Sequence, residues 1–321
     1  MNIAVVGLGS MGKRRIRLLR TIQSDCKIVG IDSNRERMGK VAEEYQIEVY
    51  QTLSEVMAEL DCVFVCTSPS YHGKIIEEAL LRGCHVFTEI NLIPDMYESN
   101  MKLAEEKGKV LFLSSTTLYK SEMRYIKGVV EGEQNCSAYM YHVGQYLPDW
   151  HPWDNLKDFF ISNQRTNGCR ELLAIELPWI QYAFGKIEHV NVVKRKLTTL
   201  EVDFPDTYLI QVEHEGGNVG SIIMDVVSRE AVRKLEIINE NFYIRWDGTP
   251  ETLMEKDVET GELKMVPTGQ YIHEQGYGNF INEYAYLKEI EEFFAVIDGK
   301  QAIYGFAEDM EIIKIIDEIE S

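Results

Sequence analysis

The chain has 321 residues, of which 45% are hydrophobic and 26% charged, and its formal net charge is -19. This length fits about two domains, and the apolar content is sufficient for sizeable cores. The negative charge repels nucleic-acid phosphates and anionic lipids, so we expect neither a nucleic-acid nor a membrane partner. No apolar stretch reaches the roughly 20 residues of a membrane-spanning helix. Because a strand-like segment follows Met1 directly, we expect a cytoplasmic protein without a signal peptide.

The six cysteines are scattered through apolar stretches, and no group of cysteines or histidines has the spacing of a metal site. A disulfide framework is therefore not expected. Cys62 and Cys66 share one face of a strand-like run, where buried structural thiols are the ordinary case. The sequence thus predicts no bound metal.

Strand and helix patterns alternate over residues 1–118, which predicts an N-terminal α/β domain of the Rossmann type. Such a domain is a doubly wound parallel sheet with helices on both faces. Each expected strand is a short apolar run that follows a polar helical segment. The expected strands cover residues 2–6, 27–31, 47–50, 61–66, 84–88 and 109–114.

Longer strands follow one another in residues 119–321, which predicts a C-terminal α+β domain with a large mixed or antiparallel sheet. The run Glu215-Gly-Gly-Asn218 predicts a hairpin, because glycine and asparagine accept positive φ. A helix is expected over 169–184, and closing helices that can pack back on the first domain are expected over 279–297 and 307–320. The expected strands cover residues 137–146, 187–197, 207–215, 218–227 and 232–247.

A glycine-rich motif follows the first expected strand and opens the first expected helix. Gly7 permits a tight turn, Gly9 lets a pyrophosphate approach the main chain, and Gly12 allows close helix packing. The helix N-terminus attracts the anion, and Asp32 lies 20 residues past Gly12, where an acidic residue meets the adenosine ribose. The motif predicts a dinucleotide site, although a simple glycine turn is the alternative. Its cofactor-binding candidates are Gly7, Gly9, Ser10, Met11, Gly12 and Asp32.

Asp32 also predicts which dinucleotide binds, since a carboxylate accepts hydrogen bonds from both ribose hydroxyls and repels a 2′-phosphate. NAD is therefore favoured over NADP. Arg35 and Arg37 lie close enough to reach a phosphate, but the pattern is more typical of a solvated helix start. A basic run on the first helix is interpreted mainly as a solvated face, and it consists of Lys13, Arg14, Arg15, Arg17 and Arg20.

A polar turn over residues 67–72 follows the fourth expected strand at the carboxyl edge of the sheet, where open α/β sheets bind ligands. Its main-chain and hydroxyl groups are expected to line the cofactor. The alternative is a helix cap made by Ser70, and the two roles are compatible. The cofactor-binding candidates in this turn are Thr67, Ser68, Pro69 and His72.

These features together resemble the glucose-fructose oxidoreductase and inositol dehydrogenase family, called Gfo/Idh/MocA, over nearly the whole chain. The resemblance also includes the run Cys84-His-Val-Phe-Thr-Glu89, Gly168 before a helix, and Phe184-Gly185 at the end of that helix. It implies a nicotinamide cofactor in the N-terminal domain and a sugar, cyclitol or related polyol against the C-terminal sheet. It also implies a homo-oligomer, a dimer or tetramer, built on that sheet.

The sequence departs from the family at its catalytic motifs. Where the family has Glu-Lys-Pro after the fifth strand, with the lysine near the reacting carbinol, this chain has Glu89-Ile90-Asn91. Where the family has an aspartate and, four residues later, an acid/base histidine, this chain has Glu171 and Ile175. Two of the three catalytic side chains are thus aliphatic. The resemblance places Glu89 and Asn91 beside the nicotinamide.

Oxidation of an alcohol requires a proton acceptor beside the hydroxyl, and isoleucine cannot accept a proton. The ionisable candidates for this catalytic role are His151, Glu171 and Glu176. His151 lies between tryptophans, which suits sugar recognition, while Glu176 has apolar neighbours that raise a carboxyl pKa. The alternatives are a packed loop histidine and a salt bridge from Glu176 to Arg170 or another cation of the helix. The candidates for substrate binding are Tyr146, Trp150, Trp153 and Arg170.

Three functions are compatible with this one cofactor site. The first is an NAD-dependent oxidoreductase acting on CH-OH groups of a sugar or sugar derivative. The second is a non-catalytic NAD-binding sensor or scaffold, which the missing lysine and histidine favour. The third is internal redox, in which bound NAD is reduced and reoxidised within one turnover, so that the net reaction is an epimerisation or an elimination.

Overall fold

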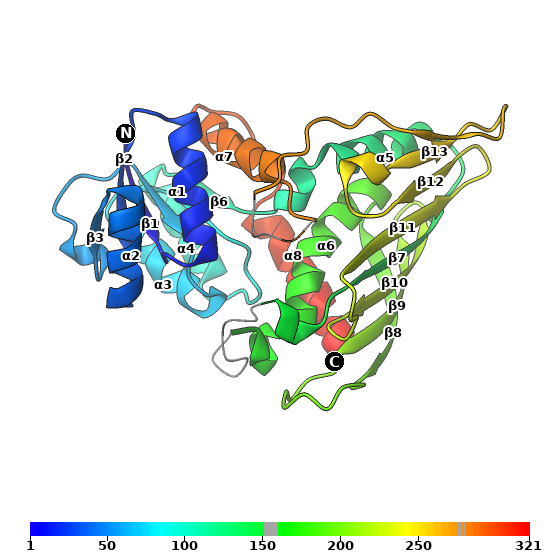
Figure 1. Ribbon diagram of the computed structural model, residues 1–321, viewed down its shortest axis with the longest axis horizontal. Coiled ribbons are helices and arrows are strands. Elements are labelled where there is room, and N and C mark those ends of the chain that lie inside the picture. The colour runs from blue at the N-terminus through cyan, green and yellow to red at the C-terminus, as the bar shows by residue number, and fades with distance from the viewer. Residues whose placement is uncertain (151–159, 275–277, 279) are drawn as a thin grey trace. The chain divides into compact units, whose positions relative to one another are not determined.

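The computed structural model describes residues 1–150, 160–274, 278 and 280–321. The chain forms two compact units (Figure 1). The N-terminal unit comprises Met1–Ser115 and Tyr286–Met310. The C-terminal unit comprises Thr116–Ala285 and Glu311–Ser321. Each unit is therefore completed by a segment from the last part of the sequence.

The N-terminal unit contains a six-stranded sheet with the strand order β3-β2-β1-β4-β5-β6, and all of its neighbouring strands are parallel. This order reverses direction between β1 and β4, which confirms the predicted doubly wound sheet. Every expected strand is present, β1 and β2 with the expected bounds and the other four slightly shorter. The strands are β1 (Asn2–Val6), β2 (Lys27–Ile31), β3 (Glu48–Tyr50), β4 (Cys62–Val65), β5 (His85–Thr88) and β6 (Leu111–Leu113).

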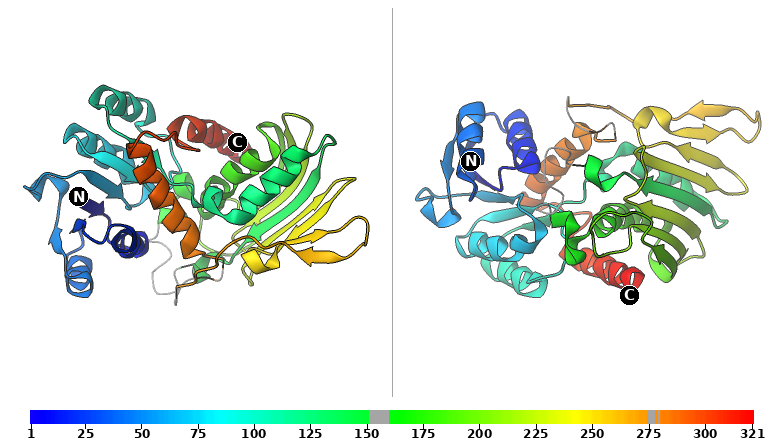
Figure 2. Two further views of the ribbon diagram at one scale, coloured as in Figure 1. Left: turned by 90° about the horizontal axis from the view of Figure 1, so that it is seen from above. Right: turned by 60° about the horizontal axis from the view of Figure 1, so that its bottom comes forward.

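One face of this sheet has an aromatic core. Phe64, Phe87 and Phe112 are neighbours in register on β4, β5 and β6. Phe293 contacts all three rings edge-on, with ring centroids 5.4 to 5.7 Å apart, a geometry that stabilises aromatic pairs. The helix that carries Phe293 therefore completes this face together with the first helix, while α3 and α4 cover the other face (Figure 2). The helices are α1 (Ser10–Ile22), α2 (Arg35–Tyr45), α3 (His72–Leu81), α4 (Tyr97–Lys107) and α7 (Glu283–Ile297).

The C-terminal unit contains an eight-stranded sheet with the order β14-β13-β12-β11-β7-β10-β9-β8. β7 and β10 are parallel, and the other neighbouring pairs are antiparallel. The predicted mixed sheet is thus confirmed. The strands are β7 (Ala138–Gly144), β8 (Ile187–Arg195), β9 (Thr207–His214), β10 (Val219–Asp225), β11 (Val232–Ile238), β12 (Tyr243–Trp246), β13 (Met254–Lys256) and β14 (Leu263–Met265).

Side chains alternate between buried and exposed along the central strands of this sheet. Tyr139 and Tyr141 of β7 are buried, whereas Met140 between them is 50% exposed. One face therefore packs against helices and the other does not, as Figure 2 also shows. The helices are α5 (Ser121–Gly132), α6 (Gly168–Phe184) and α8 (Phe306–Glu320), whose last part belongs to this unit.

The predicted hairpin at residues 215–218 is confirmed, and it joins β9 to β10. The single strand expected over 232–247 is wrong, because the chain turns and forms the antiparallel pair β11 and β12. Asn239 makes this turn: its N–H donates to the carbonyl of Phe242 at 3.1 Å, and its side chain accepts from the N–H of Asn241 at 2.9 Å. The short strands β13 and β14 were not predicted.

Among the described residues, no helix combines the length and the hydrophobicity that crossing a membrane requires.

Candidate functional site

The corner between β1 and α1 is packed too closely for side chains at two of its glycines. Gly7 has a φ of +91°, and a Cβ there would lie 2.6 Å from the carbonyl oxygen of Cys66. A Cβ on Gly12 would lie 1.9 Å from the carbonyl oxygen of Gly7. Main-chain atoms therefore exclude larger residues at both positions, which explains why glycine stands there.

Gly9 differs from these two glycines, because a Cβ added to it would have no heavy atom within 4 Å. Gly9 is the N-cap of α1, and as a glycine it has no side chain that could accept a hydrogen bond from the first N–H groups of the helix. These N–H groups therefore lie at the positively polarised end of the helix, with open space next to them. This is the arrangement that binds a pyrophosphate. The corner fits the phosphates of a dinucleotide.

Asp32 directly follows β2 and is 6% exposed. Its Oδ2 accepts a hydrogen bond from the N–H of Leu8 at 2.8 Å, and its Oδ1 accepts one from the N–H of Asn34 at 2.8 Å. Arg37, which was predicted to lie on a solvated helix start, directs its Nη1 at Oδ2 from 3.0 Å. The carboxylate is therefore held next to the glycine-rich corner, as a ribose-binding group requires.

The turn after β4 brings the predicted residues Thr67, His72 and Asn91 together. Nε2 of His72 lies 2.8 Å from the carbonyl oxygen of Thr67, and Nδ1 lies 2.6 Å from Oδ1 of Asn91. Burial lowers the pKa of His72. Oγ1 of Thr67 is buried without a hydrogen-bond partner in the described part of the chain, so this hydroxyl is available to a ligand. The alternative cap by Ser70 is not formed, because Tyr71 is the N-cap of α3 and makes no side-chain cap bond.

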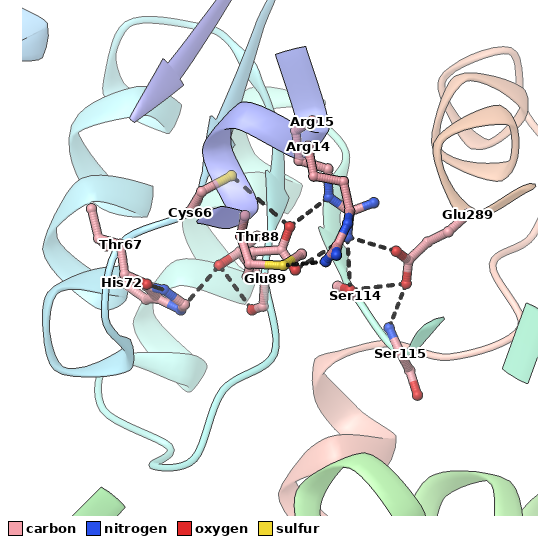
Figure 3. A network of polar contacts seen from close by, with 11 residues as sticks. Arg14, Arg15, Cys66, Thr67, His72, Thr88, Glu89, Ser114, Ser115 and Glu289 are labelled. Atoms are coloured by element: carbon pink, nitrogen blue, oxygen red, sulfur yellow. Dashed lines mark hydrogen bonds and ion pairs between the residues drawn. The ribbon is translucent and has the colours of Figure 1, made fainter. Parts of the chain in front are cut away.

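Glu89 follows β5 and belongs to a buried cluster around Arg15 (Figure 3). Nε and Nη2 of Arg15 donate to the two carboxylate oxygens of Glu89 at 2.5 and 3.1 Å, and Nη2 also donates to Glu289 at 2.8 Å. Glu289 accepts further hydrogen bonds from Oγ of Ser114 at 2.9 Å and from the N–H of Ser115 at 2.7 Å. These five residues, the Arg15 cluster, join α1, the ends of β5 and β6, and α7.

The predicted solvated face of α1 is wrong for Arg14 and Arg15, which are 2% and 0% exposed. Arg15 follows Gly12 by three residues and precedes Leu19 by four, so it lies on the face of α1 that packs against the sheet. This spacing was the signal in the sequence that Arg15 is buried. The positive charge of its side chain led instead to the prediction of a solvated face.

Glu171 lies in the first turn of α6. Its Oε2 is buried and has no hydrogen-bond partner among the described residues. Burial raises the pKa of Glu171 to about 7, although a helix N-terminus favours the ionised form of a carboxyl group. A carboxyl group that titrates near neutral pH and lacks a fixed partner has the properties of a proton acceptor.

Glu176, the second carboxylate predicted on α6, is fully occupied by donors. Its Oε2 accepts from the hydroxyl of Tyr141 at 2.8 Å and from Nε1 of Trp179 at 2.6 Å, and its Oε1 pairs with Arg233 of β11. A salt bridge of Glu176 is therefore present, but its cation is Arg233 of a strand and not Arg170 or another cation of the helix. These contacts favour a structural role for Glu176.

Arg170 contacts α8. Its Nη2 donates to Asp317 at 2.7 Å, and its Nη1 pairs with Glu320. The guanidinium thus connects α6 to α8, and a role of Arg170 in substrate binding stays a prediction.

The structure describes two of the predicted aromatic residues, Tyr146 and Trp150, and Trp150 lies near the start of α6. A Cβ on Gly168, the first residue of α6, would lie 3.8 Å from the ring of Trp150. The guanidinium of Arg229 lies over the ring of Tyr146, 3.7 Å from its centroid, which is a cation–π geometry. Two further candidates, His151 and Trp153, lie outside the residues that the structure describes.

Lys120 is a buried titratable group that the sequence analysis did not single out. It is 7% exposed, and its Nζ lies 3.5 Å from the carbonyl oxygen of Phe280 and 5.4 Å from the ring centroid of Trp246. Burial and the nearby charge of Arg233 lower the pKa of Lys120 to about 8. Lys120 directly precedes α5, and its charge indicated an exposed position in the sequence.

Comparison with known proteins identifies the class of the N-terminal unit. Residues 1–115 match the model of the Gfo/Idh/MocA group, described as an oxidoreductase family with an NAD-binding Rossmann fold. The resemblance seen in the sequence is confirmed for this part of the chain, and so is the predicted NAD-binding type of Rossmann fold.

Curated relatives match about the same share of the chain. Biliverdin reductase A of Mus musculus is 30% identical over 136 residues, which are 41% of this chain and 45% of that protein. UDP-N-acetylglucosamine 3-dehydrogenase of Acidithiobacillus ferrooxidans is 25% identical over 130 residues, which are 40% of this chain and 41% of that protein. The chain thus spans less than half the length of these relatives, and their differing names show that the matched region does not define the substrate.

The likeness of fold extends over the whole chain. A solved structure of levoglucosan dehydrogenase in complex with NADH and L-sorbose covers 99% of this chain and 95% of its own, with a TM-score of 0.80 at 16% identity. At this identity the likeness is one of fold, and it confirms the predicted combination of a Rossmann domain with a C-terminal α+β domain.

Replacing Gly9 with valine is expected to weaken NADH binding by about tenfold or more, because the side chain enters the space beside the start of α1. The fold is expected to persist, since the φ of -72° at Gly9 suits any residue. Fluorescence titration of NADH measures the affinity, and thermal melting measures the stability. Gly39→Val, at an equally open position in α2, is the matched control. Unchanged affinity of the Gly9 variant would contradict the pyrophosphate assignment.

Replacing Arg15 with methionine is expected to lower the free energy of unfolding by about 3–5 kcal/mol, because two buried carboxylates lose their cation. Urea unfolding measures this change. Lys13→Met on the same helix removes a surface ion pair with Glu44 and should cost less than about 1 kcal/mol. Equal losses in the two variants would show that the Arg15 cluster does not anchor the unit.

Replacing Glu171 with glutamine is expected to stabilise the protein at alkaline pH. The folded-state pKa of about 7 lies above the ordinary value of 4.5, so the unfolded chain ionises first and wild-type stability falls as the pH rises between these values. Glutamine does not ionise, so the variant should gain about 2–3 kcal/mol over wild type near pH 8 and nothing near pH 4. Urea unfolding at both pH values measures this.

The control for this substitution is Glu188→Gln, at an exposed position of β8, which should change the free energy of unfolding by less than about 0.5 kcal/mol. A gain in the Glu171 variant that is the same at both pH values would contradict the burial of an ionisable carboxyl group there.

Proposed function

We propose that this protein is an NAD-dependent oxidoreductase that transfers a hydride between the nicotinamide and a CH-OH carbon of a sugar, cyclitol or sugar derivative. The family match over residues 1–115 supports the cofactor class. The open position at Gly9 and the fixed carboxylate of Asp32 support a dinucleotide bound by this chain's own groups. When bound, the nicotinamide supplies or accepts the hydride.

The observation that carries the proposal is the carboxyl group of Glu171. The family's lysine and histidine are replaced by Ile90 and Ile175, so another group must take the hydroxyl proton when hydride leaves the adjacent carbon. Glu171 has a pKa raised to about 7 by burial, and its Oε2 has no partner in the described part of the chain. These are the properties of an acid/base residue that works near neutral pH.

The other groups of the proposed site bind and orient the cofactor. We propose that the first N–H groups of α1 hold the pyrophosphate, that Asp32 accepts from the ribose hydroxyls, and that the hydroxyl of Thr67 lines the cofactor. Glu89 is fixed by Arg15 and shapes the turn that continues to Asn91. None of these groups exchanges a proton with the substrate in this scheme.

A sugar or sugar derivative is the proposed substrate class. Trp150 lies near the start of α6, whose first turn carries Glu171. Aromatic rings cover the CH faces of sugars while a carboxylate binds a hydroxyl. The names of a similar curated protein and a similar solved structure, a UDP-N-acetylglucosamine dehydrogenase and a levoglucosan dehydrogenase, agree with this class.

The aliphatic residues Ile90 and Ile175 favour a second candidate, a non-catalytic NAD-binding sensor. Internal redox, with an epimerisation or elimination as the net reaction, is the third. The cofactor site is common to all three, so turnover and its products distinguish them. The predicted homo-oligomer and the cytoplasmic location stay predictions.

Incubation with NAD and a panel of sugars and nucleotide sugars is expected to form NADH, which absorbance of the reduced nicotinamide detects. Glu171→Gln should lower turnover by about a hundredfold or more and leave NADH affinity within about twofold of wild type, because only proton transfer is lost. Oxidation should speed up as the pH rises through about 7, since the carboxylate is the accepting form.

Glu188→Gln, the exposed control, should retain turnover and the same pH profile. Bound NADH with no turnover on any sugar would support the sensor. Products that differ from the substrate without net NADH would support internal redox, and full turnover in the Glu171 variant would remove this residue from the proton-transfer role.

A further inference from the structure

The turn between β10 and β11 is fixed to the end of the C-terminal sheet by Asp225, which is 3% exposed. Oδ1 of Asp225 accepts from the N–H groups of Val227 and Ser228 at 2.9 and 2.7 Å. Oδ2 accepts from Oγ of Ser228 at 3.0 Å and lies 2.7 Å from Nε2 of His142. A carboxylate offers about four lone-pair positions, so these contacts fill all of them. The turn that leads to Arg229 is therefore held in one conformation.

The guanidinium of Arg229 is oriented by an aromatic ring. It lies over the ring of Tyr146, 3.7 Å from the centroid. Stacking of this kind restricts a planar guanidinium and leaves the N–H donors at its edge directed away from the ring. Tyr146 directly precedes Leu147, whose N–H donates to the carbonyl of Val226 at 3.0 Å. The ring and the guanidinium therefore come from two turns that are hydrogen-bonded to each other.

Arg229 has no counter-ion in the described part of the chain. Its side chain is exposed, and no described residue forms an ion pair with it. Asp225, which fixes its turn, has no acceptor position left. The chain has 52 acidic and 33 basic residues, and Arg170 and Arg233 in the same unit do pair with carboxylates. An oriented guanidinium without a carboxylate of its own is arranged to bind an anion from solution.

The two turns pack against the start of α6. A Cβ on Gly168, the first residue of α6, would lie 2.9 Å from Cδ1 of Leu147 and 3.1 Å from Cγ1 of Val226. Glu171 follows Gly168 by three residues, which is less than one turn of the helix. The chain segments that carry the stacked guanidinium and the proposed proton acceptor are therefore packed together within the C-terminal unit.

We propose that Arg229 determines the substrate class of this chain by binding an anionic group, a carboxylate or a phosphate, on the sugar. This inference rests on the proposed function, because it takes the sugar to bind beside Glu171. A planar guanidinium offers two parallel N–H donors to either anionic group. Tyr146 is a positioning residue in this scheme, since it holds the guanidinium and does not itself bind the charge. The chain therefore favours a charged sugar over its neutral counterpart.

The test compares neutral and charged forms of the same sugars as substrates with NAD. Glucose, galactose and mannose are each compared with the corresponding uronate and sugar phosphate, in wild type, Arg229→Gln and Arg195→Gln. Wild type is expected to have a kcat/KM about tenfold or more higher for a charged form than for its neutral counterpart. Arg229→Gln should lose this preference mainly through a higher KM, because the ion pair forms in the ground state as well as in the transition state. Arg195→Gln, at an exposed position of β8, should retain the preference.

Two further measurements distinguish recognition of charge from a structural effect. In wild type, added salt should lower kcat/KM for the charged sugar and leave that for the neutral sugar unchanged, and Arg229→Gln should abolish this salt dependence. Tyr146→Phe keeps the aromatic ring and should retain the preference, whereas Tyr146→Leu should reduce it by about threefold or more. Thermal melting of each variant checks that it is folded.

Each outcome bears on the inference. A preference for the uronate identifies the anionic group as a carboxylate, a preference for the sugar phosphate identifies it as a phosphate, and either result supports the role of Arg229. Equal kcat/KM for charged and neutral sugars in wild type, or the same loss on all sugars in Arg229→Gln, would overturn the inference and leave the proposed function intact. Absence of turnover on every sugar would overturn both together.

Discussion

The N-terminal unit depends on one buried cation. Arg15 has no exposed surface and lies between the carboxylates of Glu89 and Glu289, with its guanidinium against the ring of Phe87 at 4.5 Å from the centroid. A charge removed from water in this way is tolerated only when partners and hydrogen bonds compensate it. Removing the cation leaves two buried carboxylates without a counter-ion, so the cluster specifies one arrangement of α1, β5 and α7.

This constraint connects the two ends of the cofactor site. Arg15 follows the glycine-rich corner on α1, and it pairs with Glu89 at the start of the turn that continues to Ile90 and Asn91. Asn91 in turn contacts His72, whose Nε2 lies beside the carbonyl oxygen of Thr67. Burial raises the pKa of Glu289, and the charge of Arg15 opposes this rise. The cluster contains one cation for two carboxylates, so the hydrogen bonds that Ser114 and Ser115 donate to Glu289 are also needed to stabilise the buried charges.

Features that depend on the local sequence pattern were predicted correctly. Features that depend on a residue far away in the sequence were not. The Rossmann sheet was predicted from the spacing of its strands and glycines, because only glycine fits at positions 7 and 12. The turn at Asn239 was missed because it contains no glycine, and the strands β13 and β14 were missed because each is only three residues long, too short to show an alternating pattern. The burial of Arg15 depends on Glu289, which is 274 residues away. No local pattern contains that pairing.

The same limit explains the two carboxylates of α6. Glu171 lies in the first turn of α6 beside Arg170, and Glu176 lies further along the same helix among apolar residues. Their contacts differ, because Tyr141 and Arg233 from the sheet hold the carboxylate of Glu176 in place. Glu171 lies one and a half turns earlier, where burial acts without a compensating donor in the described part of the chain and raises its pKa to about 7. The two carboxyl groups of this helix thus have different surroundings, which support a structural role for Glu176 and the proposed proton transfer for Glu171.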